Sequence, residues 1–341
     1  MRYASITDRL AHLGSGKWTV HLKAREMMAK GVPVIELTIG EPDILPDTAL
    51  MDEADRAMRA GRIRYSNGRG EPSVVAALTD KYRQRRADVT ERNILCFPGT
   101  QTALFAVMLG LVEGGDAVLV GDPLYATYEG VIAATGAKMI PVPLRPENRF
   151  HLLAEDLEKA VTPECRVLLL NTPHNPTGAT LTEEEITAIG EVCKRHDLWI
   201  VCDEVYEHIV FDGRRHHPLM TLPGMRERTI RIGSAGKTFS LTGWKVGYVT
   251  AAPALLDPVT KAHQFTTFTT PPGLQKAVAY GLAKGDDYYE SLSGDLQAKR
   301  DRFAAGLGAI GLEAAPCAGT YFITVDARPL GFGEDDTEIC R

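Results

Sequence analysis

One lysine stands in a loop between two apolar, strand-like runs, where a solvated charge is not expected. Lys237 lies between Gly236 and Thr238, after the run at residues 229–233 and before the run at residues 246–250. An ordinary lysine, with a pKa of ~10.4, is a poor nucleophile at neutral pH, whereas a desolvated lysine can form a Schiff base. A lone lysine in a loop is most often solvated, so its interpretation depends on what the rest of the chain places beside it.

Other side chains able to do chemistry follow the predicted strands at their carboxyl ends. In open α/β sheets ligands bind beyond these ends, so the side chains there share one rim. They are Gly99, Thr100 and Gln101 at the start of a predicted helix, then Tyr125, Asn175, Asp203, Tyr206 and Ser234. Together with Lys237 they offer a helix N-terminus suited to a phosphate, an aromatic ring, an amide, a carboxylate, a phenol and an amine.

Each of these residues also has an ordinary structural explanation. Asp203 could cap a helix, residues 175–178 have the composition of a turn, and Ser234 could be a turn hydroxyl. Tyr125 and Tyr206 could be packing residues. Their joint placement at successive strand ends, rather than any single residue, favours a shared site.

The spacing of apolar residues predicts the scaffold that must position them. Strands are expected at residues 35–39, 94–97, 117–120, 138–142, 166–170, 199–202, 229–233, 246–250 and 319–325. Helices are expected at residues 1–30, 47–60, 72–86, 100–111, 125–135, 154–161, 182–196, 273–284 and 288–308, with another starting at Asp335. Several strands are continuous apolar runs that alternate with helices, which favours a mostly parallel sheet covered on both faces.

Composition excludes several classes of protein. The 341 residues are 44% hydrophobic and 24% charged, with a net charge of −6, which is typical of a soluble globular protein and gives no basic footprint for nucleic acid. The longest apolar run, residues 103–112, is too short to span a bilayer, and the N-terminus has no signal-peptide core. The six scattered cysteines form no Cys-x-x-Cys pair, so we expect free thiols in a reducing cytoplasm and no metal site.

Five motifs in order along the chain resemble those of the class I/II aminotransferases, which are pyridoxal-phosphate enzymes of fold type I. The motifs are Gly99-Thr100-Gln101, Asp122-Pro123-x-Tyr125, Asn175-Pro176-x-Gly178, Asp203-x-x-Tyr206, and Ser234-x-x-Lys237 with its tail at residues 242–247. The resemblance covers the chain from Gly40 to Tyr321. The N-terminal stretch, with Met1-Arg2-Tyr3, Trp18 and His21, also resembles arginine–pyruvate transaminases.

The resemblance implies a domain division as well as an α/β fold with a mostly parallel sheet flanked by helices. Residues 41–275 would form the large cofactor-binding domain. Residues 1–40 would join a small α+β domain that is completed by residues 276–341. That small domain is expected to be incomplete, because the arginine with which the family binds the substrate α-carboxylate would lie beyond Arg341.

The resemblance also assigns catalytic roles residue by residue. Lys237 would form the Schiff base with the cofactor aldehyde and then carry the proton. Asp203 would pair with the protonated ring nitrogen, so that the ring stays protonated and draws off electrons. Tyr206 and Asn175 would hydrogen-bond the phenolic oxygen of the ring, and Tyr125 would stack on its face.

The remaining roles implied by the resemblance concern the phosphate and the substrate. Thr100, with the backbone of Gly99 and Gln101, would hold the phosphate together with Ser234 and Lys245. Lys245 replaces the arginine of many relatives and lacks its bidentate fork. Tyr65 would reach the phosphate of the neighbouring subunit, which implies a homodimer with shared sites. Gly40 and Asn175 would lie against the substrate.

The resulting hypothesis is a cytoplasmic, homodimeric aminotransferase that moves the amino group of an L-amino acid to a 2-oxo acid by a ping-pong mechanism. Neither a membrane nor a nucleic-acid partner is expected. Two alternatives stay open at this point. A pyridoxal-phosphate-dependent β C–S lyase would need the same Lys237 and Asp203. A non-catalytic cofactor-binding regulator would lack the family's carboxylate-binding arginine.

Overall fold

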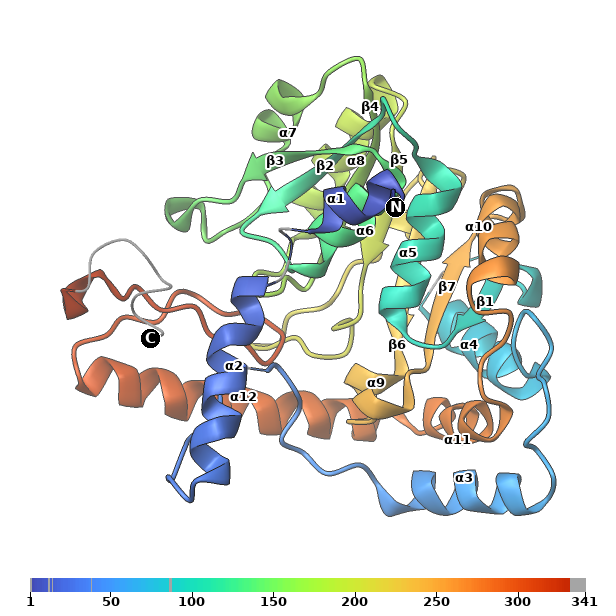
Figure 1. Cartoon of the computed structure of the whole chain (residues 1–341), viewed down its shortest axis with the longest axis horizontal. Coiled ribbons are helices and arrows are strands. Elements are labelled where there is room, and N and C mark those ends of the chain that lie inside the picture. The colour runs from blue at the N-terminus through green and yellow to red at the C-terminus, as the bar shows by residue number, and fades with distance from the viewer. Residues whose placement is uncertain (1, 12, 14, 38, 86–87, 332–341) are drawn as a thin grey trace.

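A seven-stranded sheet at the centre of the molecule positions all other elements in this computed structural model, which describes residues 2–11, 13, 15–37, 39–85 and 88–331 (Figure 1). The strands are β1 (Ile94–Phe97), β2 (Ala117–Asp122), β3 (Lys138–Pro143), β4 (Cys165–Asn171), β5 (Trp199–Asp203), β6 (Thr229–Ser234) and β7 (Gly247–Ala251). Their order across the sheet is β1-β7-β6-β5-β4-β2-β3. Only β7 runs antiparallel to its neighbours, so the predicted mostly parallel sheet is confirmed.

Helices cover both faces of the sheet, because successive strand residues point to opposite sides. Val167 and Leu169 of β4 face one apolar cluster, which contains buried residues of α5 (Thr100–Leu111), α6 (Thr127–Thr135) and α10 (Pro253–Thr266). Leu168 and Leu170 face a second cluster with α7 (Ala154–Ala160) and α8 (Glu183–Arg195). The strands other than the edge strand β3, which is partly exposed, are therefore buried on both sides, as their continuous apolar runs predict.

A third apolar cluster packs further helices against the end of the sheet that β1 and β7 form. The helices are α3 (Thr48–Arg59), α4 (Pro72–Gln84) and α11 (Pro272–Leu282). The long α12 (Asp286–Ala309) follows and extends beneath the sheet in the view of Figure 1. These helices lie within two residues of their predicted bounds, and α12 begins two residues earlier than expected.

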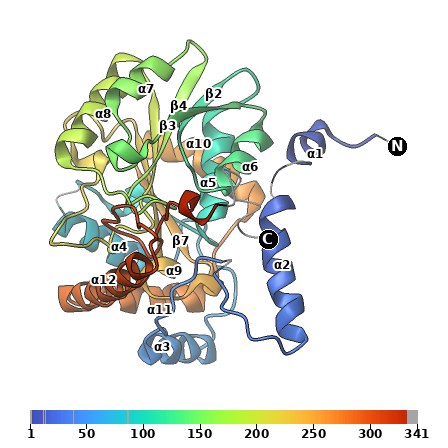
Figure 2. The same cartoon turned by 90° about the vertical axis from the view of Figure 1, so that its left-hand side faces the viewer.

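The prediction of one continuous helix over residues 1–30 is wrong. Two helices are present instead, α1 (Ser5–Leu10) and α2 (Ser15–Ala29), and they lie to one side of the body of the molecule (Figure 2). The sequence between them includes Gly14, and glycine has a low helix propensity. α1 is held by Arg9, whose guanidinium donates to the carbonyl groups of Ala133 and Ala134 at the end of α6.

Two predicted strands are wrong as well. In the stretch predicted as strand 35–39, the described residues are not paired with any described strand, and Ile35 and Leu37 are 89% and 79% exposed. Residues 319–325 contain only isolated bridges, between Val210 and Gly319 and between Ala314 and Val325. Alternation predicted the strand at residues 35–39, but a strand also needs a partner for its backbone groups. The helix expected from Asp335 lies outside the described residues.

Two further properties of the described residues bear on the sequence interpretation. Cys96, Cys165, Cys193, Cys202 and Cys317 are buried free thiols, as expected. No helix in the described ranges combines the length and apolar character needed to cross a membrane.

Candidate active site

A cleft of ≈ 1060 Å³ opens at the carboxyl ends of β4 and β5. This volume suits a cofactor together with a substrate. The predicted site residues that line it are Gly40, Thr100, Gln101, Tyr125, Asn175, Asp203, Tyr206, Lys237 and Lys245. Gly99 directly precedes Thr100, and Ser234 caps the short helix that carries Lys237, but neither lines the cleft, and Tyr65 is not part of it.

The amine of Lys237 is held at one side of this cleft. Lys237 belongs to the short helix α9 (Ala235–Thr238), whose N-cap Ser234 accepts a hydrogen bond from the Lys237 backbone N–H at 3.3 Å. Its Nζ donates to the hydroxyl of Tyr321 at 2.7 Å. Burial lowers the pKa of the Lys237 amine, against the raising effect of the Asp203 and Glu41 charges. A lowered pKa is what a lysine needs to act as a nucleophile or a proton carrier near neutral pH.

The carboxylate of Asp203 forms part of the cleft wall. Asp203 is the last residue of β5 and pairs in register with Asn171 of β4. It is 4% exposed, and its Oδ2 accepts a hydrogen bond of 2.7 Å from the hydroxyl of Tyr128. Burial raises the pKa of Asp203 to about 6, although the hydrogen bond from Tyr128 favours the charged form. A buried carboxylate in this state lacks a strong counter-charge and is suited to a cationic ligand group.

Asn171 ties the loop after β4 to the end of β5. Its Nδ2 donates to the carbonyl oxygen of Asp203 at 2.8 Å, and its Oδ1 accepts from the backbone N–H of Asn175 at 2.7 Å. Asn175 and Asp203 are therefore fixed relative to each other. The ring of Tyr206 lies nearby, edge-on to that of Tyr321, with 5.3 Å between ring centroids.

Thr100 lines the cleft at the start of α5, where the chain passes through a glycine. Gly99 has φ +92°, a value that disfavours side chains, and a Cβ there would lie 3.0 Å from Cε of Lys245. A Cβ on Gly247 would lie 2.9 Å from the backbone nitrogen of Thr100. The Lys245 side chain thus runs beside the N-terminus of α5, and together they form a positive corner suited to an anion.

Two of the three predicted aromatic residues, Tyr125 and Tyr65, occupy different places. Tyr125 lines the cleft and packs edge-on against Tyr128, with 5.4 Å between centroids. Tyr65 is 87% exposed and packs against Phe268 instead. Tyr65 therefore does not reach the cleft of its own chain.

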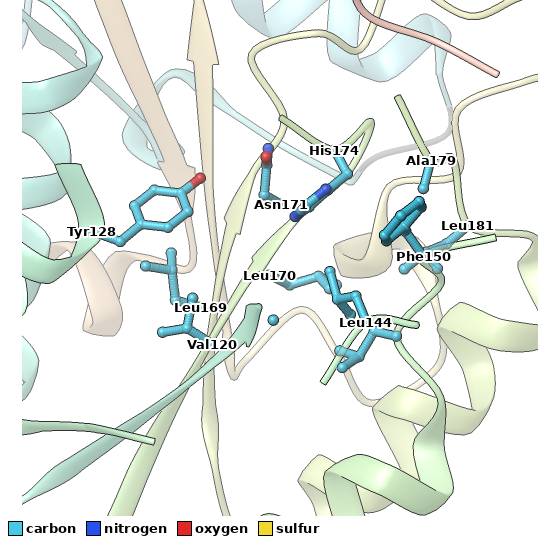
Figure 3. A pocket seen from close by; sticks show the side chains of 12 residues that line it. Val120, Tyr128, Leu144, Phe150, Leu169, Leu170, Asn171, His174, Ala179 and Leu181 are labelled. Carbon is cyan, nitrogen blue, oxygen red and sulfur yellow. The ribbon is translucent and has the colours of Figure 1, made fainter. Parts of the chain in front are cut away.

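A second, much smaller cavity lies beside the cleft. Its volume is ≈ 20 Å³, room for about one water molecule. Figure 3 shows the polar ends of Tyr128 and Asn171 on one side of it, with the apolar side chains of Val120 and Leu169 below. It is a gap in the packing beneath the site and is too small for a substrate.

The sequence interpretation missed Tyr128, Asn171 and Tyr321, which contact the predicted residues directly. For Tyr128 a signal existed, because it stands one helical turn after Tyr125 on a helix that begins at the rim. For Asn171 the signal was its position directly after the predicted strand at residues 166–170, because the predicted site residues also follow strands. Tyr321 had no local signal, since 84 residues separate it from Lys237.

Comparison with known proteins agrees with this geometry. The family model described as "Aminotransferase class I and II" matches residues 32–341. The chain is 40% identical over 317 residues to a probable N-succinyldiaminopimelate aminotransferase of Mycobacterium tuberculosis, covering 92% of this chain and 79% of that protein. It is 34% identical to an arginine–pyruvate transaminase of Pseudomonas aeruginosa, covering 97% and 84%.

A solved structure shares the whole architecture. The N-succinyldiaminopimelate aminotransferase of Mycobacterium tuberculosis superposes with a TM-score of 0.92 and 38% identity, covering 100% of this chain and 87% of that one. The chain therefore belongs to the class I and II aminotransferases, which are pyridoxal-phosphate-dependent enzymes of fold type I.

Proposed function

We propose that transamination takes place in the cleft between Lys237 and Asp203, with the roles given below. The observation that carries the proposal is the presence of a half-buried amine with a lowered pKa and a buried carboxylate in one cleft. Perturbed pairs of this kind are typical of catalytic sites.

The residues of the cleft fit pyridoxal phosphate on three separate counts. Lys237 offers an amine for the aldehyde. Asp203 offers a buried carboxylate for the ring nitrogen, and its pKa is raised by burial. The start of α5 and the side chain of Lys245 offer an anion site. Gly99 and Gly247 let the Lys245 side chain and the strand that follows it lie close to the start of α5. When bound, the cofactor supplies the electron sink for the transfer of the amino group.

The chain's own groups would then orient the reactants and move the proton. Nζ of Lys237 would take the proton from the substrate α-carbon and return it, as its lowered pKa permits. Asp203 would keep a fixed negative charge beside the ring nitrogen. Tyr206 and Asn175 would hold the phenolic oxygen of the ring, and Tyr125 would cover one face.

The anion-binding groups and the substrate contact complete the assignment. Thr100, with the backbone of Gly99 and Gln101, would hold the phosphate together with Ser234 and Lys245. Gly40 would lie against the substrate, with Asn175 on the other side. Support comes from the position of Gly40 at the cleft, where its carbonyl group accepts a hydrogen bond from Tyr321 at 3.1 Å.

A homodimer with shared sites is part of the proposal. An exposed apolar region includes Tyr65, which is 87% exposed, and Ile63, which is 72% exposed. A hollow of ≈ 650 Å³ adjoins it, lined by residues such as Met58 and Leu274. A second copy of the chain would cover this region and bring Tyr65 to the partner's phosphate site.

The proposed division into domains follows the sequence hypothesis. Residues 41–275 form the cofactor-binding domain, and residues 1–40 and 276–341 contribute to the small one. The protein is further proposed to act in the cytoplasm, in keeping with its buried free thiols.

An assay with several amino donors and one 2-oxo acid tests the function. The donors should include N-succinyldiaminopimelate, arginine and aspartate, which appear in the names of similar enzymes. We expect a new oxo acid to form only when the acceptor is present. A parallel assay with an S-substituted cysteine tests the alternative, because release of thiol and ammonia without an acceptor would instead identify a β C–S lyase.

A further inference from the structure

The hydroxyl group of Tyr321 joins two parts of the site that are far apart in the chain. It accepts a hydrogen bond from Nζ of Lys237 at 2.7 Å and donates one to the carbonyl oxygen of Gly40 at 3.1 Å. Burial raises the pKa of Tyr321 above that of an ordinary phenol, so the hydroxyl keeps its proton at neutral pH. The ring is fixed edge-on against Tyr206.

The direction of both hydrogen bonds follows from the chemistry of the three groups. A carbonyl oxygen can only accept, so the single proton of the Tyr321 hydroxyl must point to Gly40. Tyr321 can then only accept from Lys237, and the amine must donate; the hydroxyl of Tyr206 also donates to Tyr321. The backbone of Gly40 thereby determines how Lys237 is oriented.

We infer that Tyr321 is a positioning residue that directs the lone pair of the Lys237 amine into the cleft, an inference that rests on the proposed role of Lys237 as proton carrier. A neutral amine has two N–H bonds and one lone pair. With one N–H held by Tyr321, the lone pair cannot face Tyr321 and occupies one of the other two positions. Without that bond the amine rotates freely about the Cε–Nζ bond, and fewer of its orientations are productive.

Gly40 is suited to accept the hydrogen bond from Tyr321, because a residue without a side chain lets the chain at position 40 lie against residues 321 and 322. A Cβ on Gly40 would overlap the ring of Phe322, the residue after Tyr321. Any larger residue at position 40 would move its carbonyl oxygen away from the Tyr321 hydroxyl.

The inference is tested first in the cofactor-free protein with Tyr321→Phe, which removes the hydroxyl and keeps the ring. The reactivity of Lys237 toward acetic anhydride is measured as a function of pH by peptide mass spectrometry. Because Tyr321 accepts a hydrogen bond from the ammonium form, its loss should lower the pKa of Lys237 by about one unit, a roughly ten-fold change in proton affinity. Tyr289→Phe, which removes another buried hydroxyl away from the cleft, is the matched control and should leave that pKa unchanged.

The second measurement uses the cofactor-loaded enzyme with an amino acid deuterated at the α-carbon. Tyr321→Phe should lower kcat roughly ten-fold and increase the isotope effect on kcat, because proton transfer becomes more rate-limiting. Tyr289→Phe should change neither quantity. Thermal unfolding of both variants verifies that they are folded.

Two results would overturn the inference. One is an unchanged pKa of Lys237 in Tyr321→Phe, which would mean that the hydrogen bond is not made. The other is a lowered pKa with unchanged kcat and isotope effect, which would mean that the bond does not orient the amine for the reaction. Failure of the proposed role of Lys237 is recognised separately, because borohydride would then fix the cofactor of the unmodified enzyme to another residue. Failure of the proposed function is recognised by an oxo acid that forms without an acceptor.

Discussion

The hydroxyl group of Tyr128 donates a 2.7 Å hydrogen bond to Oδ2 of Asp203, and both side chains are buried. The bond connects α6 to the end of β5 and favours the charged carboxylate. Burial acts in the opposite direction and is the larger effect, since the pKa of Asp203 is raised to about 6. The cofactor-free protein therefore carries a buried negative charge at neutral pH at the expense of its stability.

This relationship predicts how stability depends on pH in the cofactor-free protein. Between pH 4 and pH 6 the folded state holds a proton on Asp203 that the unfolded chain has lost, so the free energy of unfolding should fall as pH rises, by about 3 kcal/mol. Asp203→Asn cannot titrate and should flatten this dependence. Denaturant unfolding at several pH values measures it, with the exposed Asp80→Asn as control. An identical slope in wild type and Asp203→Asn would contradict the assignment.

Asp203→Asn should also lower the turnover of the cofactor-loaded enzyme. Asparagine can still accept the hydrogen bond from Tyr128 but carries no charge for the ring nitrogen. We expect Asp203→Asn to bind the cofactor yet lose orders of magnitude in kcat. A rate close to that of wild type would refute the proposed pairing.

Lys237 should be the residue to which the cofactor becomes fixed on reduction. Borohydride treatment of the loaded protein should give a covalent adduct on the peptide that contains Lys237, identified by mass spectrometry. Lys237→Ala should give no adduct, because Lys245, the other lysine that lines the cleft, is assigned to the phosphate, whereas the exposed Lys261→Ala should behave as wild type. An adduct on a different lysine would show that the Schiff-base residue has been misassigned.

Much of this site could be predicted because its residues stand at strand ends. A parallel sheet brings the residues after β4, β5 and β6 to one edge, so Asn175, Asp203 and Lys237 could be grouped without coordinates. The continuous apolar runs of the strands likewise predicted a sheet covered by helices on both faces.

The rest depended on contacts that no local pattern contains. Tyr321 meets Lys237 only through the tertiary fold. α10 was not predicted, and Pro258 inside it is unfavourable to a helix. Packing overrides that propensity, since Gly110 of α5 lies so near that a Cβ there would be 3.2 Å from the backbone carbon of Pro258. Residues 35–37 and 39 had the alternation of a strand but pair with no strand among the described residues.

Lys245 should contribute to cofactor affinity more than to the chemical step. Its side chain lies beside Gly99 at the start of α5, where the phosphate is proposed to bind. Lys245→Ala should raise the dissociation constant of the cofactor about ten-fold or more, with kcat at saturation largely kept, because a charge-assisted hydrogen bond is lost. Lys245→Arg should retain the affinity. Equilibrium dialysis measures both, and an unchanged constant in Lys245→Ala would exclude this role.

Shared sites predict complementation between two inactive variants. Lys237→Ala and Tyr65→Ala should each be poorly active alone. After mixed refolding, half of the dimers should be hybrids in which one site has both Lys237 and the partner's Tyr65, so about a quarter of wild-type activity should return. If Tyr65 acted in its own chain or not at all, mixing would restore nothing. Light scattering of the mixture verifies that dimers have formed.

Arg231 should be a major determinant of stability although it does not line the cleft. It is 1% exposed in β6, and its guanidinium pairs with Glu204 at 2.5 Å and Glu207 at 2.6 Å, both buried. These glutamates stand on either side of Tyr206 in the segment after β5. Arg231→Met would leave two buried carboxylates without their main counter-charge and should cost about 3–5 kcal/mol of unfolding free energy.

The matched control is Arg56→Met, which breaks an ion pair of an arginine that is 72% exposed and should cost about 1 kcal/mol or less. Adding Glu204→Gln to Arg231→Met should restore part of the loss, because it removes one of the two unbalanced charges. Denaturant unfolding compares the three variants. If Arg231→Met were no more destabilising than Arg56→Met, the buried ion pairs would not hold the Asp203–Tyr206 segment against β6.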